Sequence, residues 1–194
     1  TQDHRIGELI TPLGKDVLVL VRFDGTEGLS ELFEFRIEAL SEEADIDFDK
    51  AIGQQCTLKL KTYGQEREFS GILVEAQWLG VKYDYYSYRI VLRPWLWLLS
   101  HTADCRIFQD KKAPDIIKQV FKDRGFTDFE SKLTDEGSYP ELEYCVQYRE
   151  TDLNFVTRLM EKEGIYYYLK HNGNKHTLVL ADSKSSHQAV PGQA

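Results

Sequence analysis

Apolar and polar residues alternate in several segments of the first half of the chain, a pattern typical of β-strands. In the segment 33–39, apolar side chains take every second position and charged side chains lie between them. This predicts a strand with one buried face and one solvated face, as in an antiparallel sheet. Related patterns occur at 17–23, 58–61 and 69–78, and a tyrosine-rich segment runs over 83–92. We therefore expect an antiparallel β-barrel or sandwich.

Glycines are expected to shape this sheet. Asp24-Gly25 is expected to form a turn after the first strand, and Tyr63-Gly64 a hairpin turn. The apolar positions change parity near Gly71. We expect a β-bulge there, because a bulge bends a strand as barrel closure requires.

Beyond residue 100, two segments follow the period of an α-helix. A first helix is predicted over 114–124 with Gly125 as its stop, and a second follows Thr151 as N-cap and stops at Gly164. Further strands are expected at 144–148, 165–170 and 177–181. The predicted organisation is therefore a mainly β protein, in which a β-barrel domain over residues 1–100 precedes an α+β domain over residues 101–194.

Composition and charge narrow the possible functions. The 194 residues are 42% hydrophobic, 29% charged and 12% aromatic, which suits a globular β-rich chain. The net charge of −8 disfavours binding to nucleic acid and to anionic membranes. The longest apolar run, Trp95–Leu99, is far shorter than the roughly 20 residues of a spanning helix, and no signal peptide is recognisable. We expect a cytoplasmic, soluble chain without a membrane anchor, and its first residue, Thr1, suggests a piece of a longer protein.

No local motif predicts a catalytic, cofactor or metal site. The chain has no GxSxG, Walker or GxGxxG sequence, although a dispersed acid/base pair stays open. The isolated Cys56, Cys105 and Cys145 are expected to be buried small hydrophobes. His171 and His176 straddle an Asn-Gly turn, so we expect them to be exposed hairpin residues rather than zinc ligands.

The aromatic residues allow two interpretations. A sugar-stacking platform needs flat rings on one exposed face. The tryptophans and tyrosines here occupy both parities of their strands, which favours a barrel core and a subunit contact. The residues expected at such an interface are Trp95, Trp97, Tyr86 and Tyr88.

Three segments in order carry a family resemblance. They are 23–35 (FDGTEGLSELFEF), 106–109 (RIFQ) and 144–168, which contains YCVQYRETDLNFV and MEKEGIYYY. The chain resembles, from about Leu9 to Asp182, the VgrG family of trimeric type VI secretion spike proteins, which are related to phage tail hubs. The motif residues to which the resemblance assigns a structural role are Gly28, Leu29, Phe33, Phe35, Phe108, Gln147, Tyr148, Glu150, Asp152, Phe155, Glu163 and Gly164.

The resemblance implies the hub portion of a spike, without catalysis or cofactors. A homotrimer would join the hexameric Hcp tube to the spike, contact baseplate proteins, effectors or chaperones, and be injected into target cells after cytoplasmic assembly. The family's second barrel, its neck, and the needle that carries a PAAR tip are not in this sequence. Near the second helix, Gln147, Tyr148, Glu150 and Asp152 are expected to cap the helix and fix its loop. A phage tail hub, a carbohydrate-binding module and a hydrolase are the alternatives.

Overall fold

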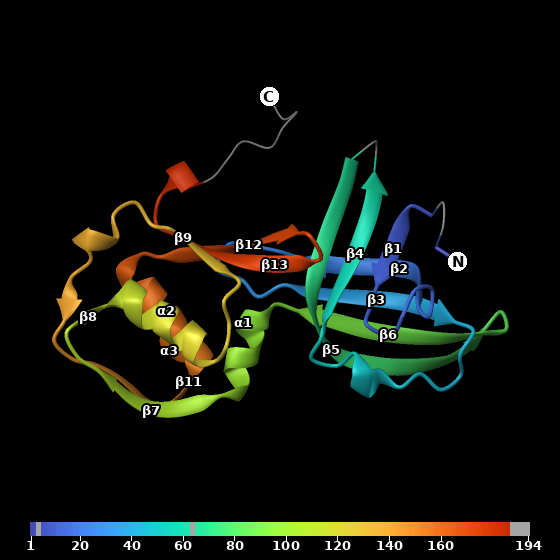
Figure 1. Cartoon of the computed structure of the whole chain (residues 1–194), viewed down its shortest axis with the longest axis horizontal. Helices are drawn as coiled ribbons and strands as arrows, with labels where there is room; N and C mark the ends of the chain where they lie inside the picture. The colour runs from blue at the N-terminus through green and yellow to red at the C-terminus, as the bar shows by residue number, and fades with distance from the viewer. Residues whose placement is uncertain (3–4, 63–64, 187–194) are drawn as a thin grey trace. The chain divides into compact units, whose positions relative to one another are not determined.

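The computed structural model describes residues 1–2, 5–62 and 65–186 (Figure 1). The chain divides into two compact units. Unit 1 contains Thr1–Trp95 and Lys170–Thr177, and unit 2 contains Leu96–Leu169 and Leu178–Ala194. A short segment from late in the chain therefore belongs to the unit built from its first half.

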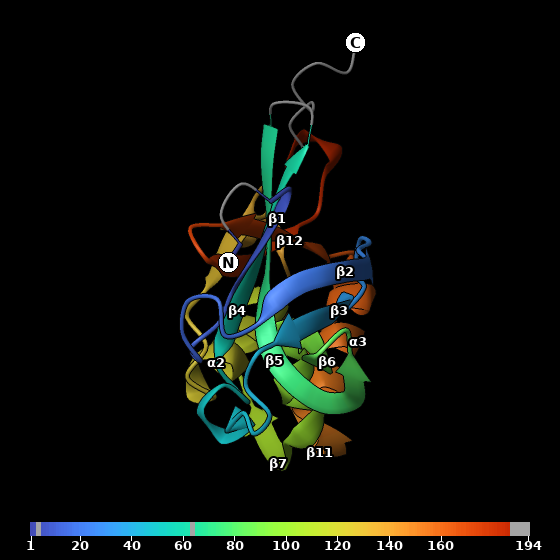
Figure 2. The ribbon, with the colours of Figure 1, turned by 90° about the vertical axis from the view of Figure 1, so that its right-hand side faces the viewer.

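Unit 1 is a six-stranded antiparallel sheet with the strand order β1-β4-β5-β6-β3-β2. Its strands are β1 (Gly7–Ile10), β2 (Val19–Thr26), β3 (Glu34–Ser41), β4 (Gln55–Thr62), β5 (Gln65–Lys82) and β6 (Tyr85–Arg93), with a 3-10 turn at Phe48–Lys50. A Cβ atom on Gly7 would lie 2.2 Å from Cδ2 of Leu20, so the two edge strands β1 and β2 approach each other (Figure 2). The predicted barrel-like fold is confirmed as a curled half-barrel.

The alternation predicted over 33–39 is confirmed in β3. Phe35, Ile37 and Ala39 are buried in the core of unit 1, while the charged residues between them face outward. The ring of Phe35 stacks on that of Phe33 with a centroid distance of 4.2 Å. The aromatic content of the sequence thus builds the inner face of the sheet.

The bends of β5 lie at other positions than predicted. Gly71 pairs regularly with Cys56, and the register shifts of β5 against β6 fall within 73–75 and 78–80. A Cβ on Gly71 would lie 2.9 Å from Cβ of Leu92. The missing side chain therefore permits close packing of two strands rather than a bulge.

The turn predicted at Asp24-Gly25 is wrong. Both residues lie inside β2 and pair with Arg36 and Phe35 of β3. A Cβ on Gly25 would lie 2.5 Å from Cδ1 of Phe35, so this glycine makes room for the phenylalanine ring. The turn expected at Tyr63-Gly64 lies outside the described residues.

Unit 2 combines helices with short sheets (Figure 1). The strands are β7 (Ala103–Phe108), β8 (Lys111–Lys112), β9 (Phe129–Lys132), β10 (Glu141–Leu142), β11 (Cys145–Thr151), β12 (Tyr166–Asn172) and β13 (Lys175–Ala181). β7 pairs antiparallel with β11, and β13 pairs parallel with β9. The tip of the β12–β13 hairpin is the segment that belongs to unit 1. The 3-10 turns are at Leu99–His101, Glu136–Ser138 and Lys184–Ser186.

Both predicted helices are confirmed, as α2 (Ala113–Asp123) and α3 (Asp152–Glu163). At the start of α3, Oγ1 of Thr151 accepts a hydrogen bond from the backbone N–H of Asn154 at 3.1 Å. Gly164 ends α3 in the left-handed conformation, with φ of 70°. A third, unpredicted helix, α1 (Trp95–Leu98), is short. Among the described residues, no helix is long and apolar enough to cross a membrane.

Candidate functional site

Asp152, at the start of α3, is the centre of a buried polar network in unit 2. Its fully buried carboxylate lies 2.6 Å from Nη2 of Arg106 and 2.5 Å from Nε of Arg124. Gln147 donates to the same carboxylate at 2.7 Å, and the hydroxyl of Thr102 donates at 2.8 Å. Burial raises the pKa of Asp152, but the hydrogen bonds and the Arg106 charge outweigh it and hold that pKa below its usual range.

The network connects four parts of unit 2. Arg106 lies on β7, Gln147 on β11, Arg124 directly after α2, and Asp152 at the start of α3. Nε of Arg106 donates to Oε1 of Gln147 at 2.9 Å, and the backbone N–H of Asp152 donates to the carbonyl of Thr102 at 2.8 Å. Because a buried charge is costly unless it is paired, this arrangement holds these elements in one geometry. Such a network suits a rigid joint better than a reactive centre.

The remaining polar motif residues face away from Asp152. Arg149 forms a bulge with φ of 51°, and Glu150 after it forms an ion pair of 2.7 Å with Arg158 of α3. Arg158 also donates to the carbonyl of Val146 at 2.7 Å. The side chain of Tyr148 is 64% exposed, and its expected loop-fixing role stays a prediction.

The apolar motif residues belong mostly to the cores. Phe108 and Phe155 stack at 5.6 Å in unit 2, and Phe33 lies in the core of unit 1. Gly28 precedes the exposed Leu29, and Glu163 is the last residue of α3. The structural roles assigned to these residues stay predictions.

The prediction that His171 and His176 are exposed hairpin residues is wrong. The ring of His171 accepts a hydrogen bond from the backbone N–H of Ser70 through Nδ1 at 2.9 Å, and its Nε2 lies 2.5 Å from Oε1 of Glu27. His176 is only 2% exposed, and its Nε2 accepts from the backbone N–H of Trp95 at 2.8 Å. No local sequence signal could have revealed this, because the partners lie 81 to 144 residues away.

Aromatic rings surround these histidines within unit 1. The ring centroid of Phe33 lies 5.3 Å from that of His171 and 5.6 Å from that of His176. The hairpin tip is therefore anchored to the sheet by both packing and hydrogen bonds. Within residues 1–2, 5–62 and 65–186, no three His, Cys, Asp or Glu side chains gather as metal ligands.

The residues expected at a subunit interface differ in accessibility. Trp95 and Tyr88 are buried inside unit 1, where the Tyr88 hydroxyl donates to the carbonyl of Ala44 at 2.9 Å. Tyr86 and Trp97 are half-buried. The more exposed aromatic side chains are Trp78, Tyr83, Tyr85, Tyr144 and Tyr148. An interface role for the four expected residues stays a prediction, and burial favours Tyr86 and Trp97 for it.

The cysteines also differ from one another. Cys56 and Cys145 are buried as expected, and burial raises the pKa of Cys56 to about 12. Cys105 is exposed, which corrects the expectation for this residue. It lies opposite the exposed Tyr148 on the β7–β11 ribbon.

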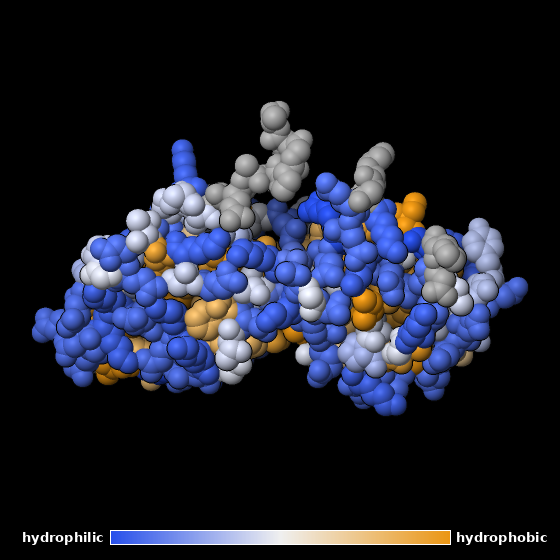
Figure 3. Space-filling view, turned by 45° about the horizontal axis from the view of Figure 1, so that its top comes forward, coloured by the Kyte–Doolittle hydropathy of each residue, from blue (hydrophilic) through white to orange (hydrophobic). Residues whose placement is uncertain are grey.

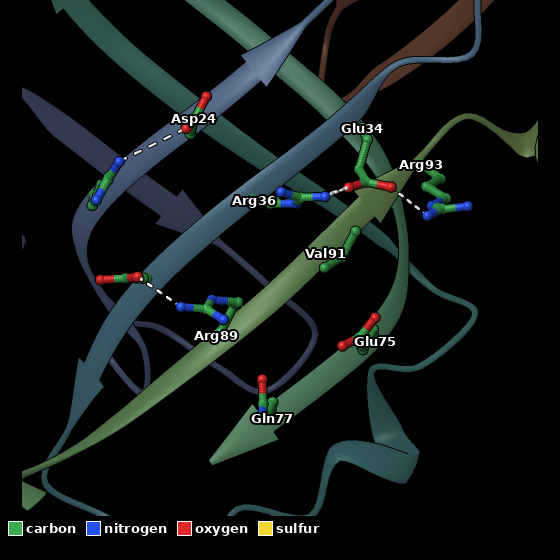
Figure 4. A pocket seen from close by; sticks show the side chains of 10 residues that line it. Asp24, Glu34, Arg36, Glu75, Gln77, Arg89, Val91 and Arg93 are labelled. Carbon is green, nitrogen blue, oxygen red and sulfur yellow. Dashed lines mark hydrogen bonds and ion pairs between the residues drawn. The ribbon is translucent and has the colours of Figure 1, made fainter. Parts of the chain in front are cut away.

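The outward face of the sheet in unit 1 is hollowed and charged (Figure 4). The hollow has a volume of about 450 Å³. It is lined by Arg22, Asp24, Glu34, Arg36, Glu38, Glu75, Gln77, Arg89, Val91 and Arg93. The charged hollow is one recognisable surface site that the sequence patterns did not single out.

The view in Figure 3 shows mostly hydrophilic residues, with hydrophobic residues in separate small areas.

Comparisons with known proteins identify relatives. The phage tail baseplate hub (GPD) family matches residues 26–194. The type VI secretion system spike protein VgrG1b of Pseudomonas aeruginosa is 47% identical over 194 residues, which cover 100% of this chain and 26% of that protein. Its VgrG1c counterpart is 46% identical over 99% of this chain and likewise 26% of that protein. The chain thus spans about a quarter of the length of these curated relatives.

A solved structure shares the fold. The E. coli c3393 protein, a type VI secretion component with structural similarity to the T4 phage tail proteins gp27 and gp5, matches with a TM-score of 0.84. Its sequence identity is 24%, and the match covers 94% of this chain and 51% of that chain. This chain also matches a chain in the solved structure of a Francisella PdpA–VgrG complex, with a TM-score of 0.63 and a sequence identity of 12%. This match covers 91% of this chain and 31% of the matched chain.

Proposed function

The chain belongs to the phage tail baseplate hub (GPD) family, and we propose that it forms the base of the spike of a type VI secretion machine. The observation that carries this proposal is the identity of 47% with a secretion spike protein over the full length of the chain. The same observation favours a secretion spike over a phage tail hub. The resemblance to the VgrG family is confirmed.

The proposed role is mechanical rather than catalytic. A spike base has to transmit force without unfolding, and the polar network around Asp152 supports this role by fixing two strands and two helices of unit 2. In unit 1, His171 and His176 anchor a late segment of the chain to β5 and to Trp95, the first residue of α1. Contacts between distant parts of a chain oppose unfolding from either end, since both parts have to separate together.

We further propose that three copies assemble in the full-length protein, contact the hexameric Hcp tube on one side, and carry effectors. The exposed apolar side chains of Ile107, Val146 and Tyr148 on the β7–β11 ribbon support a subunit contact, because such side chains gain by being covered. Assembly in the cytoplasm and injection into a target cell follow from the same role. PAAR binding would belong to parts of the protein outside this sequence.

A segment exchange tests the proposed function. In VgrG1b of Pseudomonas aeruginosa, the matching segment is replaced by this chain, and the chimera is expressed in cells that lack the native spike protein. We expect a trimer by light scattering and export of the chimera with the secretion apparatus. Unmodified VgrG1b serves as the control for export.

Two results of the segment exchange would contradict the proposed function. A chimera that is folded and trimeric but stays inside the cells, while native VgrG1b is exported, contradicts the role as spike base. A folded monomer contradicts the proposed assembly. A chimera with the exchange Asp104→Asn, at a side chain that is 42% exposed, provides a matched variant that should behave like the parent chimera.

A further inference from the structure

The tip of the β12–β13 hairpin is held in unit 1 by two imidazole rings that act as hydrogen-bond acceptors. Nδ1 of His171 accepts a hydrogen bond from the backbone N–H of Ser70 at 2.9 Å. Nε2 of His176 accepts one from the backbone N–H of Trp95 at 2.8 Å. A backbone N–H is always a donor, so each ring has to present an unprotonated nitrogen to it.

These contacts determine which nitrogen of each neutral ring carries the proton. In His171 the proton is on Nε2, which lies 2.5 Å from Oε1 of Glu27. In His176 the proton is on Nδ1, which lies 3.4 Å from the amide group of Gln55. A second proton converts either imidazole into an imidazolium, which has two donors and no acceptor. Protonation of each ring therefore conflicts with its backbone hydrogen bond.

The two rings differ in what protonation would cost. An imidazolium at His171 would lie beside the carboxylate of Glu27, whose charge offsets the loss of the backbone hydrogen bond. The nitrogens of His176 meet the amide of Gln55 and the N–H of Trp95, which are uncharged groups. His176 is only 2% exposed, so water does not compensate a charge on this ring. The cost of protonation in the docked hairpin is therefore higher at His176.

The two rings also lie close enough for charges on them to interact. Their centroids are 6.3 Å apart, and the ring of Phe33 lies 5.3 Å from that of His171 and 5.6 Å from that of His176. An aromatic neighbour lowers the local dielectric constant, so a charge on one imidazole opposes a charge on the other. Proton uptake by the tip is thus unfavourable as long as the tip stays docked in unit 1.

Other charged groups near the tip keep their charge over the pH range in which histidines titrate. Glu68 of β5 accepts a hydrogen bond of 3.4 Å from the N–H of Asn174, which lies between the two histidines in the chain. The hydrogen bond from Lys59 of β4 holds the pKa of Glu68 below its usual range. Further cations on these elements are Arg67, Lys170 and Lys175. Between pH 7.5 and 5.5 the histidines are therefore the groups that change, because lysine and arginine ordinarily titrate above this window and carboxyl groups below it.

We propose that residues 170–177 form an acid-sensitive latch, in which protonation of His176 releases the hairpin tip from the rest of unit 1. The docked tip binds fewer protons than the released tip, so acid favours release. The latch is closed above the pH of about 6.5 at which a free histidine titrates, and it weakens as the pH falls below this value. His171 leaves together with His176, because both rings lie on one short hairpin. The inference goes beyond the proposed spike role, which specifies no response to pH.

Amide hydrogen exchange tests the latch in the unmodified chain. Exchange of the Ser70 and Trp95 amides is followed by NMR at pH 7.5 and 5.5, and each rate is compared with that of an unstructured amide at the same pH. We expect the protection of both amides to fall about tenfold, because release frees a histidine that titrates near pH 6.5. The amide of Leu159 within α3 should change by less than about twofold, since it reports on unit 2.

Three results of this experiment would overturn the proposal. Unchanged protection of Trp95 would show that its contact with His176 does not respond to acid. A loss at Trp95 without a loss at Ser70 would show a local change at one ring instead of release of the tip. An equal loss at Leu159 would show that acid unfolds the whole chain.

Two conservative variants assign the response to one ring. His176→Gln offers an amide oxygen in place of Nε2, which accepts a hydrogen bond but takes up no proton in this range. We expect this variant to reduce the acid-induced loss of protection to less than about threefold. His171→Asn replaces Nδ1 by an amide oxygen in the same way, and it should retain the loss of about tenfold. The reverse pattern overturns the assignment to His176.

The matched control is His101→Gln, which makes the same exchange at an exposed histidine. This variant should retain the full acid response of the unmodified chain, because its ring does not hold the hairpin tip. A reduced response in His101→Gln equal to that in His176→Gln would indicate a general charge effect and overturn the latch. The segment exchange in VgrG1b can fail without affecting these measurements.

Discussion

Nε2 of His176 accepts a hydrogen bond of 2.8 Å from the backbone N–H of Trp95, 81 residues earlier in the chain. The histidine is buried, so water cannot replace it as an acceptor. Trp95 begins α1, and the first N–H groups of a helix have no partner within the helix. The hairpin tip therefore caps a helix start that the local sequence leaves without an acceptor.

His176→Phe is expected to destabilise the protein by about 1–3 kcal/mol, because the ring volume is kept while the buried N–H of Trp95 loses its acceptor. Urea unfolding measures the change in the free energy of unfolding. His101→Phe is the matched control at an exposed histidine, and we expect it to stay within about 0.5 kcal/mol of the wild type. Equal stability of the two variants would contradict the capping role.

Asp152→Asn is expected to cost about 3 kcal/mol, because Arg106 and Arg124 lose a buried partner charge. Asp104→Asn is the matched control. Asp104 contacts the same two arginines at 3.6 and 3.3 Å, but its side chain is 42% exposed, whereas that of Asp152 is fully buried. We expect a cost below about 1 kcal/mol for the control. Similar losses for both variants would show that burial of Asp152 is not the decisive factor.

Stability should also depend on pH through Asp152. Its pKa in the folded protein is lower than in an unfolded chain, so the unfolded state binds more protons in acid. The stabilisation is complete above the unfolded pKa of about 3.9 and is lost as the pH falls through the folded pKa. The difference in free energy of unfolding between wild type and Asp152→Asn should therefore shrink from pH 5 to pH 2. A constant difference would contradict the ionised state of Asp152.

Gly71→Ala is expected to destabilise the protein by about 1–3 kcal/mol, because the added Cβ would meet Leu92 at 2.9 Å and Phe33 at 3.0 Å. Both neighbours belong to the packed core. Gly28→Ala is the control, since the three atoms nearest to its added Cβ all belong to the flexible Glu31 side chain. Thermal unfolding of both variants should show a clear loss for Gly71→Ala and little change for Gly28→Ala. The reverse order would contradict the packing role of Gly71.

Thr151→Ala should cost about 1 kcal/mol, because the N–H of Asn154 loses its capping oxygen. Thr151→Ser keeps the hydroxyl and should retain most of the stability. Both variants are compared by urea unfolding and, in the VgrG1b chimera, by light scattering. A loss of assembly at unchanged stability would place this turn at a subunit interface instead.

Local patterns predicted the elements whose neighbours are close in sequence. The alternation over 33–39 determines which face of β3 is buried, since side chains of a strand point to opposite sides in turn. Thr151 and Gly164 mark the two ends of α3, because a cap bonds to the adjacent turn of its own helix. The order and spacing of the three motifs also sufficed to identify the family.

Only the tertiary structure decided features whose partners lie far along the chain. Gly25 and Gly71 looked like turn and bulge residues, but Phe35 and Leu92 of other strands explain their lack of a side chain. The histidines beside the Asn-Gly turn are not exposed hairpin residues, because β5 and α1 supply donors for their rings. The charged hollow of unit 1 likewise exists only through the register of four strands. Spacing along one strand determines which face a residue occupies, whereas the groups opposite it depend on how the strands pair.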